Sequence, residues 1–373
     1  MTSKLAGVRV RPFALERYFA RYEFSVRYLL CSSDPETLAL RELLALEPGA
    51  AERFGELRLG YVESQGTPAL RQAIASLYEH GDAGAVLVHG GSQEPIFTFA
   101  NAVLDAGDHI VVQWPAYQSQ LSIAEGIGAE VAPWRSDLSR EGAPDIATLE
   151  TLIRPATRAI VLTTPNNPTG YAFTRAEIEA VVGIARRNGL WIFGDEVYRG
   201  SEREADPIPA ICDLYERGIS LGGMSKVYGL AGLRIGWIST RARELYEQMA
   251  AFKDYLTICN SAPSEFLAGL ALRRRDRLVE RVKRIATANL DLLDAFFGRR
   301  RELFEWTRPR AGTTAFPRYL GGSSEAFCAN LIEGAGVLLL PSAIFDAGDE
   351  HFRIGYGRAN LPEALAALET FIG

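Results

Sequence analysis

The most informative residue of this chain is Lys226, in the run Leu221-Gly-Gly-Met-Ser-Lys-Val-Tyr-Gly-Leu-Ala-Gly-Leu-Arg-Ile-Gly236. Lys226 stands in a turn of small residues, so its amine can come close to a planar ligand. Arg234 follows between apolar residues, and we expect it to be buried and therefore to need an anion. An amine for a carbonyl and a guanidinium for a phosphate together indicate pyridoxal phosphate (PLP), held as a Schiff base. The alternative is a surface lysine in a glycine-rich loop.

Short apolar runs alternate with helical periods on both sides of this stretch. We expect strands at residues 85–89, 109–113, 130–132, 158–163, 190–194, 218–221 and 235–239, and helices at 94–103, 121–126 and 175–188. Strands that are apolar on both faces, alternating with helices, predict a mostly parallel sheet covered by helices. In such a sheet the site lies beyond the carboxyl ends of the strands.

The pattern changes after about residue 262. A long helical stretch at 263–297 leads into short strands within 313–319, 337–340 and 352–356, and then into a terminal helix at 362–371. This order is typical of a smaller α+β domain, and the N-terminal segment is expected to pack with it. We therefore predict an α/β protein with a large domain at 46–261 and a small domain formed by 1–45 and 262–373.

Composition excludes several classes of protein. The 373 residues carry a formal net charge of −6, which is unlike a nucleic-acid-binding surface. Two arginine runs, at 273–277 and 299–301, are interpreted as solvated segments, with a partner site as the alternative. The four cysteines form no CxxC pair and the four histidines have no metal-ligand spacing, so we expect no metal site and a reducing compartment. With neither a signal peptide nor a membrane-spanning run recognisable, a cytoplasmic enzyme is expected.

Several polar side chains follow the expected strands. Asp195 ends one strand and could pair with a pyridinium nitrogen, keeping it protonated so that the ring acts as an electron sink; the alternative is a helix N-cap. The segment Gly90-Gly-Ser-Gln-Glu94 joins a strand to a helix, so backbone N–H groups there could bind a phosphate, with Ser92 as the cap.

Two further segments offer contacts to a flat ring. Asn167, in the rigid loop Pro165-Asn-Asn-Pro-Thr-Gly170, and Tyr198 could hydrogen-bond a phenolic oxygen and so lower the pKa of a Schiff base. Tyr117 follows the strand at 109–113 and could stack on a heterocycle. The alternatives are a plain turn for the loop and core packing for the two tyrosines.

These motifs together resemble one family. Asn-Asn-Pro-Thr-Gly170, Asp-Glu-Val-Tyr198, Ser-Lys226 and Gly-Leu-Arg-Ile-Gly236 are similar to the motifs of the class I/II aminotransferases of PLP fold type I. Tyr61 with Gly66-Thr-Pro-Ala-Leu-Arg71, and Phe-Arg-Ile-Gly355, extend the resemblance from about residue 58 to the C-terminus. Several ordered motifs are more specific than any one of them.

The resemblance implies a role for each matching residue. Lys226 would be the Schiff-base lysine, and Asp195 and Tyr198 would complete the catalytic set. The cofactor would contact Ser92, Gln93, Tyr117, Asn167, Ser225 and Arg234, of which Ser92, Gln93, Ser225 and Arg234 would bind its phosphate. Arg353, with Asn167, would bind the substrate α-carboxylate, although an ion pair of Arg353 with Asp349 or Glu350 is the alternative. Tyr61 would reach the phosphate of a neighbouring subunit, which implies a homodimer with shared sites.

Two departures from the family pattern stand out. Gly223 occupies a position where many relatives have a phosphate-binding serine, and the segment Leu30-Cys-Ser-Ser-Asp34 replaces the usual glycine-containing one. In addition, Lys253-Asp-Tyr-Leu-Thr257 and Thr314-Ala-Phe-Pro-Arg318 are more weakly similar to capreomycidine-synthase-like members, which use PLP for elimination and cyclisation of a hydroxylated arginine.

The expected function is a PLP-dependent aminotransferase that moves an amino group from an amino acid to a 2-oxo acid through a Lys226 Schiff base. The alternative is a PLP-dependent lyase or cyclase that acts on a substituted amino acid. A third reading, a PLP-fold effector-binding module without enzymatic activity, is disfavoured by the acidic balance and by the roughly 50 residues before the core.

Overall fold

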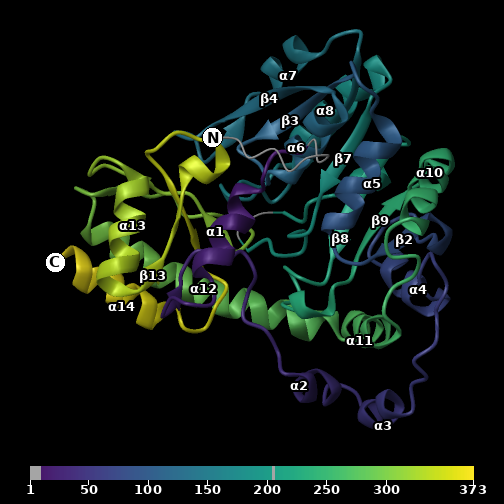
Figure 1. Cartoon of the computed structure of the whole chain (residues 1–373), viewed down its shortest axis with the longest axis horizontal. Helices are drawn as coiled ribbons and strands as arrows, with labels where there is room; N and C mark the ends of the chain where they lie inside the picture. The colour runs from purple at the N-terminus through teal and green to yellow at the C-terminus, as the bar shows by residue number, and fades with distance from the viewer. Residues whose placement is uncertain (1–9, 204–205) are drawn as a thin grey trace.

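An eight-stranded sheet forms the centre of the large domain in the computed structural model, which describes residues 10–203 and 206–373 (Figure 1). The spatial order of its strands is β2 (Val86–His89), β9 (Gly236–Thr240), β8 (Gly218–Gly223), β7 (Trp191–Asp195), β6 (Thr157–Thr163), β3 (His109–Trp114), β4 (Glu130–Asp137) and β5 (Ala143–Pro144). Strands β8, β7, β6, β3 and β4 pair in parallel, whereas β9 is antiparallel to both of its neighbours and β5 to β4. The predicted α/β class with a mostly parallel sheet is confirmed.

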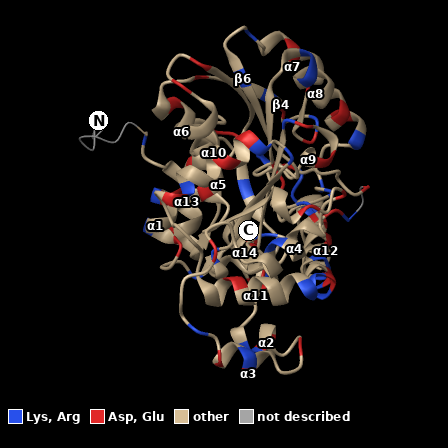
Figure 2. Cartoon of the chain, turned by 90° about the vertical axis from the view of Figure 1, so that its right-hand side faces the viewer, with Lys and Arg blue, Asp and Glu red and all other residues tan. Residues whose placement is uncertain are grey.

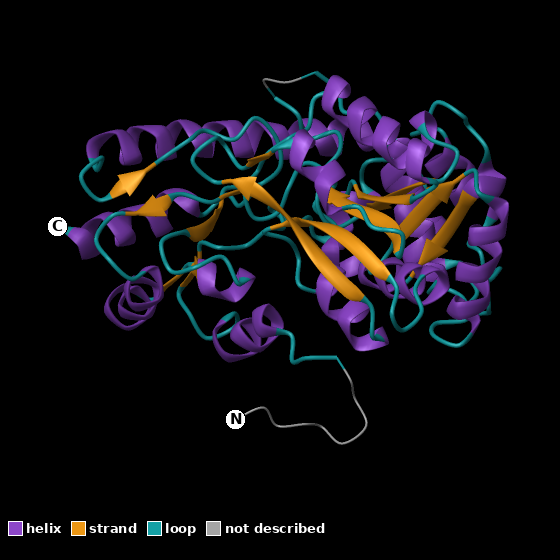
Figure 3. Cartoon of the chain, turned by 90° about the horizontal axis from the view of Figure 1, so that it is seen from above, coloured by secondary structure: helices purple, strands orange, loops and turns teal. Residues whose placement is uncertain are grey.

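Helices cover both faces of this sheet, as the view from above shows (Figure 3). One face packs against α5 (Gln93–Val103), α6 (Ser119–Ile127) and α10 (Arg243–Asp254), and the other against α7 (Ile146–Leu152), α8 (Arg175–Asn188) and α9 (Ile211–Leu214). Successive strand residues alternate between the two cores: Val112 joins the first and Val111 the second. Because side chains alternate along a strand, burial of both faces gives the continuous apolar runs seen in the sequence.

Local sequence signals explain why the elements begin and end where they do. Helix α8 begins at a capping box, in which the Thr174 hydroxyl accepts a hydrogen bond from the Glu177 N–H while the Glu177 carboxylate accepts one from the Thr174 N–H. It ends at Gly189, whose φ of 64° is left-handed and suits glycine. These caps make α8 match its predicted range.

Among the described residues, the small domain contains short strands and four α-helices. The long α12 (Arg275–Arg299) runs into it from the large domain (Figure 1), and its other elements are α1 (Ala14–Tyr22), β1 (Tyr28–Leu29), β10 (Phe304–Glu305), β11 (Thr314–Ala315), β12 (Arg318–Tyr319), α13 (Ser324–Ala335), β13 (Val337–Leu338), β14 (Leu340–Pro341), the 3₁₀ turn η3 (Ser342–Phe345), β15 (Phe352–Gly355) and α14 (Leu361–Ile372). Strand β1 pairs with β13, so the N-terminal segment joins this part of the fold.

The helical stretch predicted at 263–297 is two helices. Helix α11 (Ala262–Arg273) ends just before Arg274, whose backbone leaves the helical region at φ −115° and ψ 19°. Helix α11 packs into one apolar cluster with β2, α4 (Pro68–Ala75) and α2 (Leu40–Leu44), and α12 contributes Leu278 to this cluster and then continues into the core of the small domain. The remaining elements are α3 (Ala50–Gly55) and the 3₁₀ turns η1 (Ala83–Ala85) and η2 (Ala231–Leu233). The boundaries at 46–261, 1–45 and 262–373 stay a prediction, and residues 1–9 lie outside the described part.

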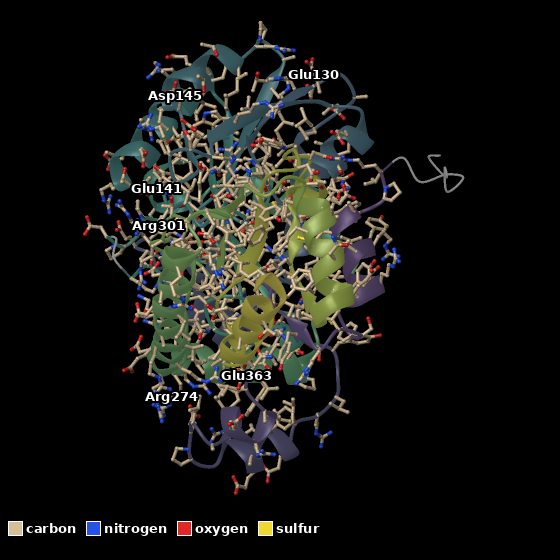
Figure 4. The ribbon with its side chains drawn as sticks, turned by 90° about the vertical axis from the view of Figure 1, so that its left-hand side faces the viewer. Glu130, Glu141, Asp145, Arg274, Arg301 and Glu363 are labelled. Carbon is tan, nitrogen blue, oxygen red and sulfur yellow. The ribbon has the colours of Figure 1, made fainter. Side chains whose placement is uncertain are left out.

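Charged residues of both signs are interspersed along the outer helices (Figure 2). Arg274 and Arg301, one from each arginine run, lie at the periphery of the molecule (Figure 4). Within the described residues, no helix combines the length and the apolar character needed to cross a membrane.

Candidate active site

A cavity of about 390 Å³ brings the predicted site residues together at the carboxyl ends of β6, β7 and β8. It is lined by every one of them except Tyr61, namely Ser92, Gln93, Tyr117, Asn167, Asp195, Tyr198, Ser225, Lys226, Arg234 and Arg353. The Tyr61 side chain is 94% exposed and lies outside this lining. A larger cavity of about 970 Å³, against α12, contains none of these side chains.

Lys226 is half-buried, and its amine donates a hydrogen bond to the Ser33 hydroxyl over 2.8 Å. Its Nζ lies 6.0 Å from the centroid of the Tyr198 ring. Burial lowers the pKa of Lys226 to about 8, with Asp34 opposing the shift and Arg353 adding to it. A larger fraction of the amine is therefore neutral near neutral pH than for an exposed lysine, which suits a nucleophile.

Asp195 is buried at the end of β7. Its Oδ2 accepts a hydrogen bond from Gln120 Nε2 at 2.9 Å, and its Oδ1 accepts a longer one from the Val197 N–H at 3.4 Å. Burial raises the pKa of Asp195 to about 6, and these two hydrogen bonds with the Lys226 charge limit the rise. The helix N-cap alternative is wrong, because no α-helix begins at this point in the described chain.

Arg353 on β15 is 1% exposed and reaches the same cavity. Its Nε donates to the Cys31 carbonyl at 3.0 Å and its Nη1 to Asn167 Oδ1 at 3.0 Å, while the buried Nη2 has no hydrogen-bond partner among the described residues. A buried guanidinium nitrogen without a partner is costly, so this donor is suited to an anion that enters the cavity.

The two acids beside Arg353 in the sequence are used elsewhere. Glu350 forms an ion pair with Arg318 at 3.2 Å, and Asp349 accepts hydrogen bonds from Ser324 and from the Glu325 N–H. The alternative in which Arg353 pairs with Asp349 or Glu350 is therefore wrong. Their carboxylates bind other groups of the small domain, and the Arg353 guanidinium faces the cavity instead.

Ser92 precedes α5 but does not cap it, contrary to the sequence expectation. Its hydroxyl donates to the Gly222 carbonyl at 3.3 Å. The Gly223 departure has a steric explanation here, because a Cβ at residue 223 would lie 2.3 Å from Ser92 Oγ. The Ser92 hydroxyl takes the space that a serine side chain at 223 would need.

Arg234 is exposed, so the expectation that it is buried was wrong. Its backbone is left-handed, with φ 50°, where η2 ends before β9. The guanidinium lies against Gly91, since a Cβ at residue 91 would lie 2.5 Å from Arg234 Nη2. The arginine, the glycine backbone and the first turn of α5 thus form a cradle at the edge of the cavity that is suited to a phosphate.

The other ring contacts differ in how well they are placed. Tyr198 is buried, and its hydroxyl faces Ser33 without a hydrogen bond of regular geometry. Tyr117 is half-buried, packs against Phe13 with ring centroids 5.0 Å apart, and donates to Glu16 Oε1 at 3.2 Å. Tyr198 therefore has a free donor toward the cavity, whereas the Tyr117 donor is already engaged.

Sequence reasoning missed the contribution of the N-terminal segment. Helix α1 places Glu16 and Phe19 in the cavity lining, its C-cap residue Glu23 joins them, and the following chain adds Ser33 and Asp34. The only sequence signal for this contribution was that segment 30–34 departs from the family pattern. The contacts themselves could not be predicted, because they join parts of the chain that lie far apart in sequence.

Asp34 is the acid in this segment that interacts with two cationic side chains. Burial alone would raise the pKa of Asp34, but Lys226 and Arg358 hold it below its ordinary value. The carboxylate forms an ion pair with Arg358 at 2.8 Å. Asp34 is therefore ionised beside the Lys226 amine at neutral pH.

Three potential metal ligands meet elsewhere, at His80, Cys212 and Asp213. The His80 Nδ1 accepts a hydrogen bond from the backbone N–H of Asp82, with 3.0 Å between the two nitrogens. In the neutral ring the proton is therefore on Nε2, which donates it to Ser239 Oγ at 3.0 Å. This hydrogen-bond pattern occupies both ring nitrogens, which agrees with a structural role for His80.

The cavity fits PLP by its own chemistry. It offers a nucleophilic amine, a buried carboxylate, a cradle that any side chain at residue 91 would fill, and unsatisfied donors on Tyr198 and Arg353. An amine, a carboxylate and an anion cradle in one cavity are what an aldehyde, a pyridine nitrogen and a phosphate on a single ring require.

Comparison with known proteins agrees with this chemistry. A family model described as aminotransferase class I and II matches residues 28–368. A capreomycidine synthase from Streptomyces vinaceus is 30% identical, over 100% of this chain and 97% of that protein. A PLP-dependent aminotransferase from Streptococcus suis superposes with a TM-score of 0.92 at 30% identity, covering 97% of this chain and 98% of the other.

A PLP-dependent cyclase, OrfR, superposes with a TM-score of 0.89 at 29% identity and covers 99% of both chains. Similarity thus extends over the whole length to proteins of two activities. Because the family model covers nearly the whole chain, this protein belongs to the class I and II aminotransferase family, and its cofactor is pyridoxal 5′-phosphate.

Proposed function

We propose that this protein transfers the amino group of an α-amino acid to a 2-oxo acid, with Lys226 as the residue that binds the cofactor and moves the proton. The observation that carries the proposal is the convergence of Lys226, Asp195 and Arg353 on one cavity. PLP, when bound, supplies an electron sink for the bonds at the substrate Cα.

The side chains of the cavity would divide the work. Arg353 would bind the substrate α-carboxylate through its unpartnered Nη2, while its bond to Asn167 holds the fork in place. Lys226, once released from the cofactor, would take the proton from Cα, since its lowered pKa makes the neutral amine available. Ser92 and Arg234 would hold the phosphate, and Asp195 would keep the pyridine nitrogen protonated.

A single-turnover experiment tests transamination. The loaded enzyme is mixed with one amino acid at a time, without an acceptor, and the 2-oxo acid is measured. Transamination predicts one equivalent of 2-oxo acid for each active site, because the amino group stays with the cofactor. If the substrate is consumed without 2-oxo acid, or if 2-oxo acid exceeds one equivalent and free ammonia appears, transamination is contradicted and the second candidate is favoured.

The second candidate is a lyase or cyclase that acts on a substituted amino acid with a cationic side chain. The observation that favours it is the presence of three carboxylates, Glu16, Glu23 and Asp34, in the lining of the cavity. Burial, with Asp34 and Glu16 nearby, raises the pKa of Glu23, as expected for carboxylates close to one another. A cation among them would relieve this repulsion.

Glu23→Gln is expected to weaken cationic substrates selectively. Since Glu23 is half-buried, we expect KM for an amino acid with a guanidinium or ammonium side chain to rise roughly threefold to tenfold. The KM of an uncharged amino acid of similar length should stay the same. Glu325→Gln, on α13 outside the cavity lining, is the matched control, and an equal change for both substrates would contradict a cation site.

Arg353→Lys is expected to weaken α-amino acids by about 1.5–3 kcal/mol, the range for a hydrogen bond to a charged group. Lysine keeps the charge but cannot offer the planar fork. The ratio kcat/KM for an α-amino acid is compared with that for an amine without a carboxylate, which should change little. Arg318→Lys, which alters an exposed ion pair in the same domain, is the control. Equal losses for both substrates would mean that Arg353 holds the fold instead of the substrate.

We also propose a homodimer in which Tyr61 reaches the phosphate cradle of the partner. The support is that Tyr61 matches the family's shared tyrosine while its ring is almost fully exposed in the single chain. A large exposed aromatic in a fixed segment is typical of an interface.

Mixing inactive Lys226→Ala and Tyr61→Ala variants should restore activity. In a mixed dimer one of the two sites receives both intact side chains, so equal mixing should yield about a quarter of the wild-type sites. Activity is measured after subunit exchange has been demonstrated with two differently tagged chains. No recovery despite exchange, or a monomer at working concentration, would contradict the shared site.

A further inference from the structure

Three loops that are distant in sequence meet beside the phosphate cradle, and charged side chains tie them together. We name them the cradle loop (89–92), the Tyr61 segment (57–67) and the 255–258 turn. The turn follows α10, which lies near β2 and α4 at the right of Figure 1. The charged side chains are Lys253, Glu94 and Glu265, and none of them lines the cavity that holds Lys226.

Lys253 joins the Tyr61 segment to the 255–258 turn. It is 1% exposed, and its Nζ donates to the Ser64 carbonyl at 2.6 Å and to the Ile258 carbonyl at 2.8 Å. A buried ammonium is costly unless it is hydrogen-bonded and near negative charge. Burial lowers the pKa of Lys253, and Glu94 and Glu265 are among the groups that oppose this shift.

Glu94 joins the cradle loop to the same turn. Its Oε2 accepts the Gly90 N–H at 2.7 Å, and its Oε1 accepts the Thr257 hydroxyl at 2.8 Å. Gly90 packs closely on this turn, since a Cβ at residue 90 would lie 3.2 Å from Thr257 Cγ2. A shift of the turn would therefore move the backbone that forms the cradle.

Glu265 forms a second hydrogen-bonded contact with the Tyr61 segment. This buried carboxylate accepts the Thr67 N–H at 2.8 Å and the Asn260 side-chain amide at 2.8 Å. The Tyr61 segment is also joined to β2, because the Val88 N–H donates to the Gln65 carbonyl at 3.0 Å. The base of the segment is thus held at several points.

The outer ends of these loops are exposed and apolar. Leu59 is 83% exposed, Tyr255 91% and Ile258 57%, and Tyr61 is exposed as described above. The loops therefore have bases fixed by buried charges and tips that are free to contact another molecule. The half-buried Glu94 connects the cradle loop to the 255–258 turn, through Gly90 and Thr257.

We propose that Lys253 and Glu94 are positioning residues that couple binding of the cofactor phosphate to docking of a second copy of this chain. The inference rests on the proposed function, in which Ser92 and Arg234 hold the phosphate and Tyr61 reaches across a dimer interface. The hydrogen bonds of Lys253 and Glu94 connect the cradle loop to the loops that face the partner. A ligand that fixes the conformation of one is therefore expected to fix the conformation of the other. Coupling of this kind is reciprocal: PLP tightens the dimer by the same factor by which dimerisation tightens PLP.

The experiment measures the dimer dissociation constant with and without saturating PLP by sedimentation. In the wild type, PLP should lower this constant about tenfold or more, within the range of allosteric couplings. Pyridoxal, which lacks the phosphate, should lower it much less. Thr257→Val removes the hydroxyl that donates a hydrogen bond to Glu94. Lys253→Met removes the hydrogen bonds to the carbonyls of Ser64 and Ile258. In both variants the effect of PLP should fall to about twofold or less.

The controls separate coupling from general loss of stability. Thr257→Ser keeps the hydroxyl and should restore the PLP effect. Tyr246→Phe on α10 removes a buried hydrogen bond to the Val86 carbonyl that touches none of the three loops, so the PLP effect should persist. Since Thr257 is exposed, Thr257→Val should fold even if Lys253→Met does not, and it then decides the result.

Each outcome decides the proposal. If the Thr257→Val dimer is weaker but PLP still tightens it as in the wild type, or if pyridoxal acts as strongly as PLP, the coupling is wrong. If the wild type is a monomer or does not bind PLP, the proposed function itself fails, and the variants are not needed to establish that.

Discussion

Replacing Lys226 by alanine is expected to abolish covalent attachment of the cofactor and to reduce turnover by at least about 1000-fold. The same amine provides the attachment point and the proton transfer at the substrate Cα, and a positioned acid–base group alone contributes 10²- to 10⁴-fold. Burial in this cavity lowers the pKa of Lys226 to about 8, and the charges of Asp34 and Asp195 limit this shift. No other described lysine lines the cavity.

The measurement is the visible absorbance of the lysine-bound cofactor together with the steady-state rate. PLP should still bind to Lys226→Ala without a covalent bond, because the cradle at Gly91, Ser92 and Arg234 is unchanged. Lys283→Ala, on α12 and outside the cavity, is the control and should behave as the wild type. Wild-type turnover in Lys226→Ala would contradict the assigned role.

Asp195→Asn is expected to keep the cofactor but to slow removal of the Cα proton at least about 100-fold. Asparagine fills the same volume and can still accept from Gln120, so the cavity should keep its shape. It has no charge with which to hold a proton on the pyridine nitrogen, and electrostatic stabilisation of this kind is worth 10²- to 10³-fold.

The measurement is exchange of the substrate Cα proton with D₂O, followed by NMR. Exchange precedes the step at which transamination and elimination diverge, so it tests Asp195 under either proposed function. Asp145→Asn, at the surface cap of α7, is the control. Exchange within a few-fold of the wild-type rate would mean that Asp195 serves only the fold.

The sheet and the positions of the motifs could be predicted because they depend on local sequence. The strands appear as apolar runs since both of their faces are buried, and α8 matches its predicted range because Thr174 and Gly189 cap it. Parallel strands place the residues that follow them at one edge of the sheet, which is why Asn167, Asp195 and Lys226 were expected to share a site.

Features set by contacts over long sequence separations could not be predicted. Arg234 lies between apolar residues yet is exposed, because its left-handed backbone directs the side chain to the mouth of the cavity. The Ser92 hydroxyl bonds to Gly222 on another strand instead of capping its own helix. The acidic lining from α1 has no local signal, since Glu16 and Glu23 look like ordinary charges of a surface helix.

The most direct test of the central claim is to locate the cofactor on the chain. The PLP-loaded protein is reduced with borohydride, digested, and analysed by mass spectrometry. Because Lys226 carries the only amine of the described lysines that faces the cavity with Asp195 and Arg353, the phosphopyridoxyl group is expected on the peptide that contains Lys226, at about one equivalent for each chain. Labelling of another lysine in place of Lys226, or an unlabelled chain, would contradict the account.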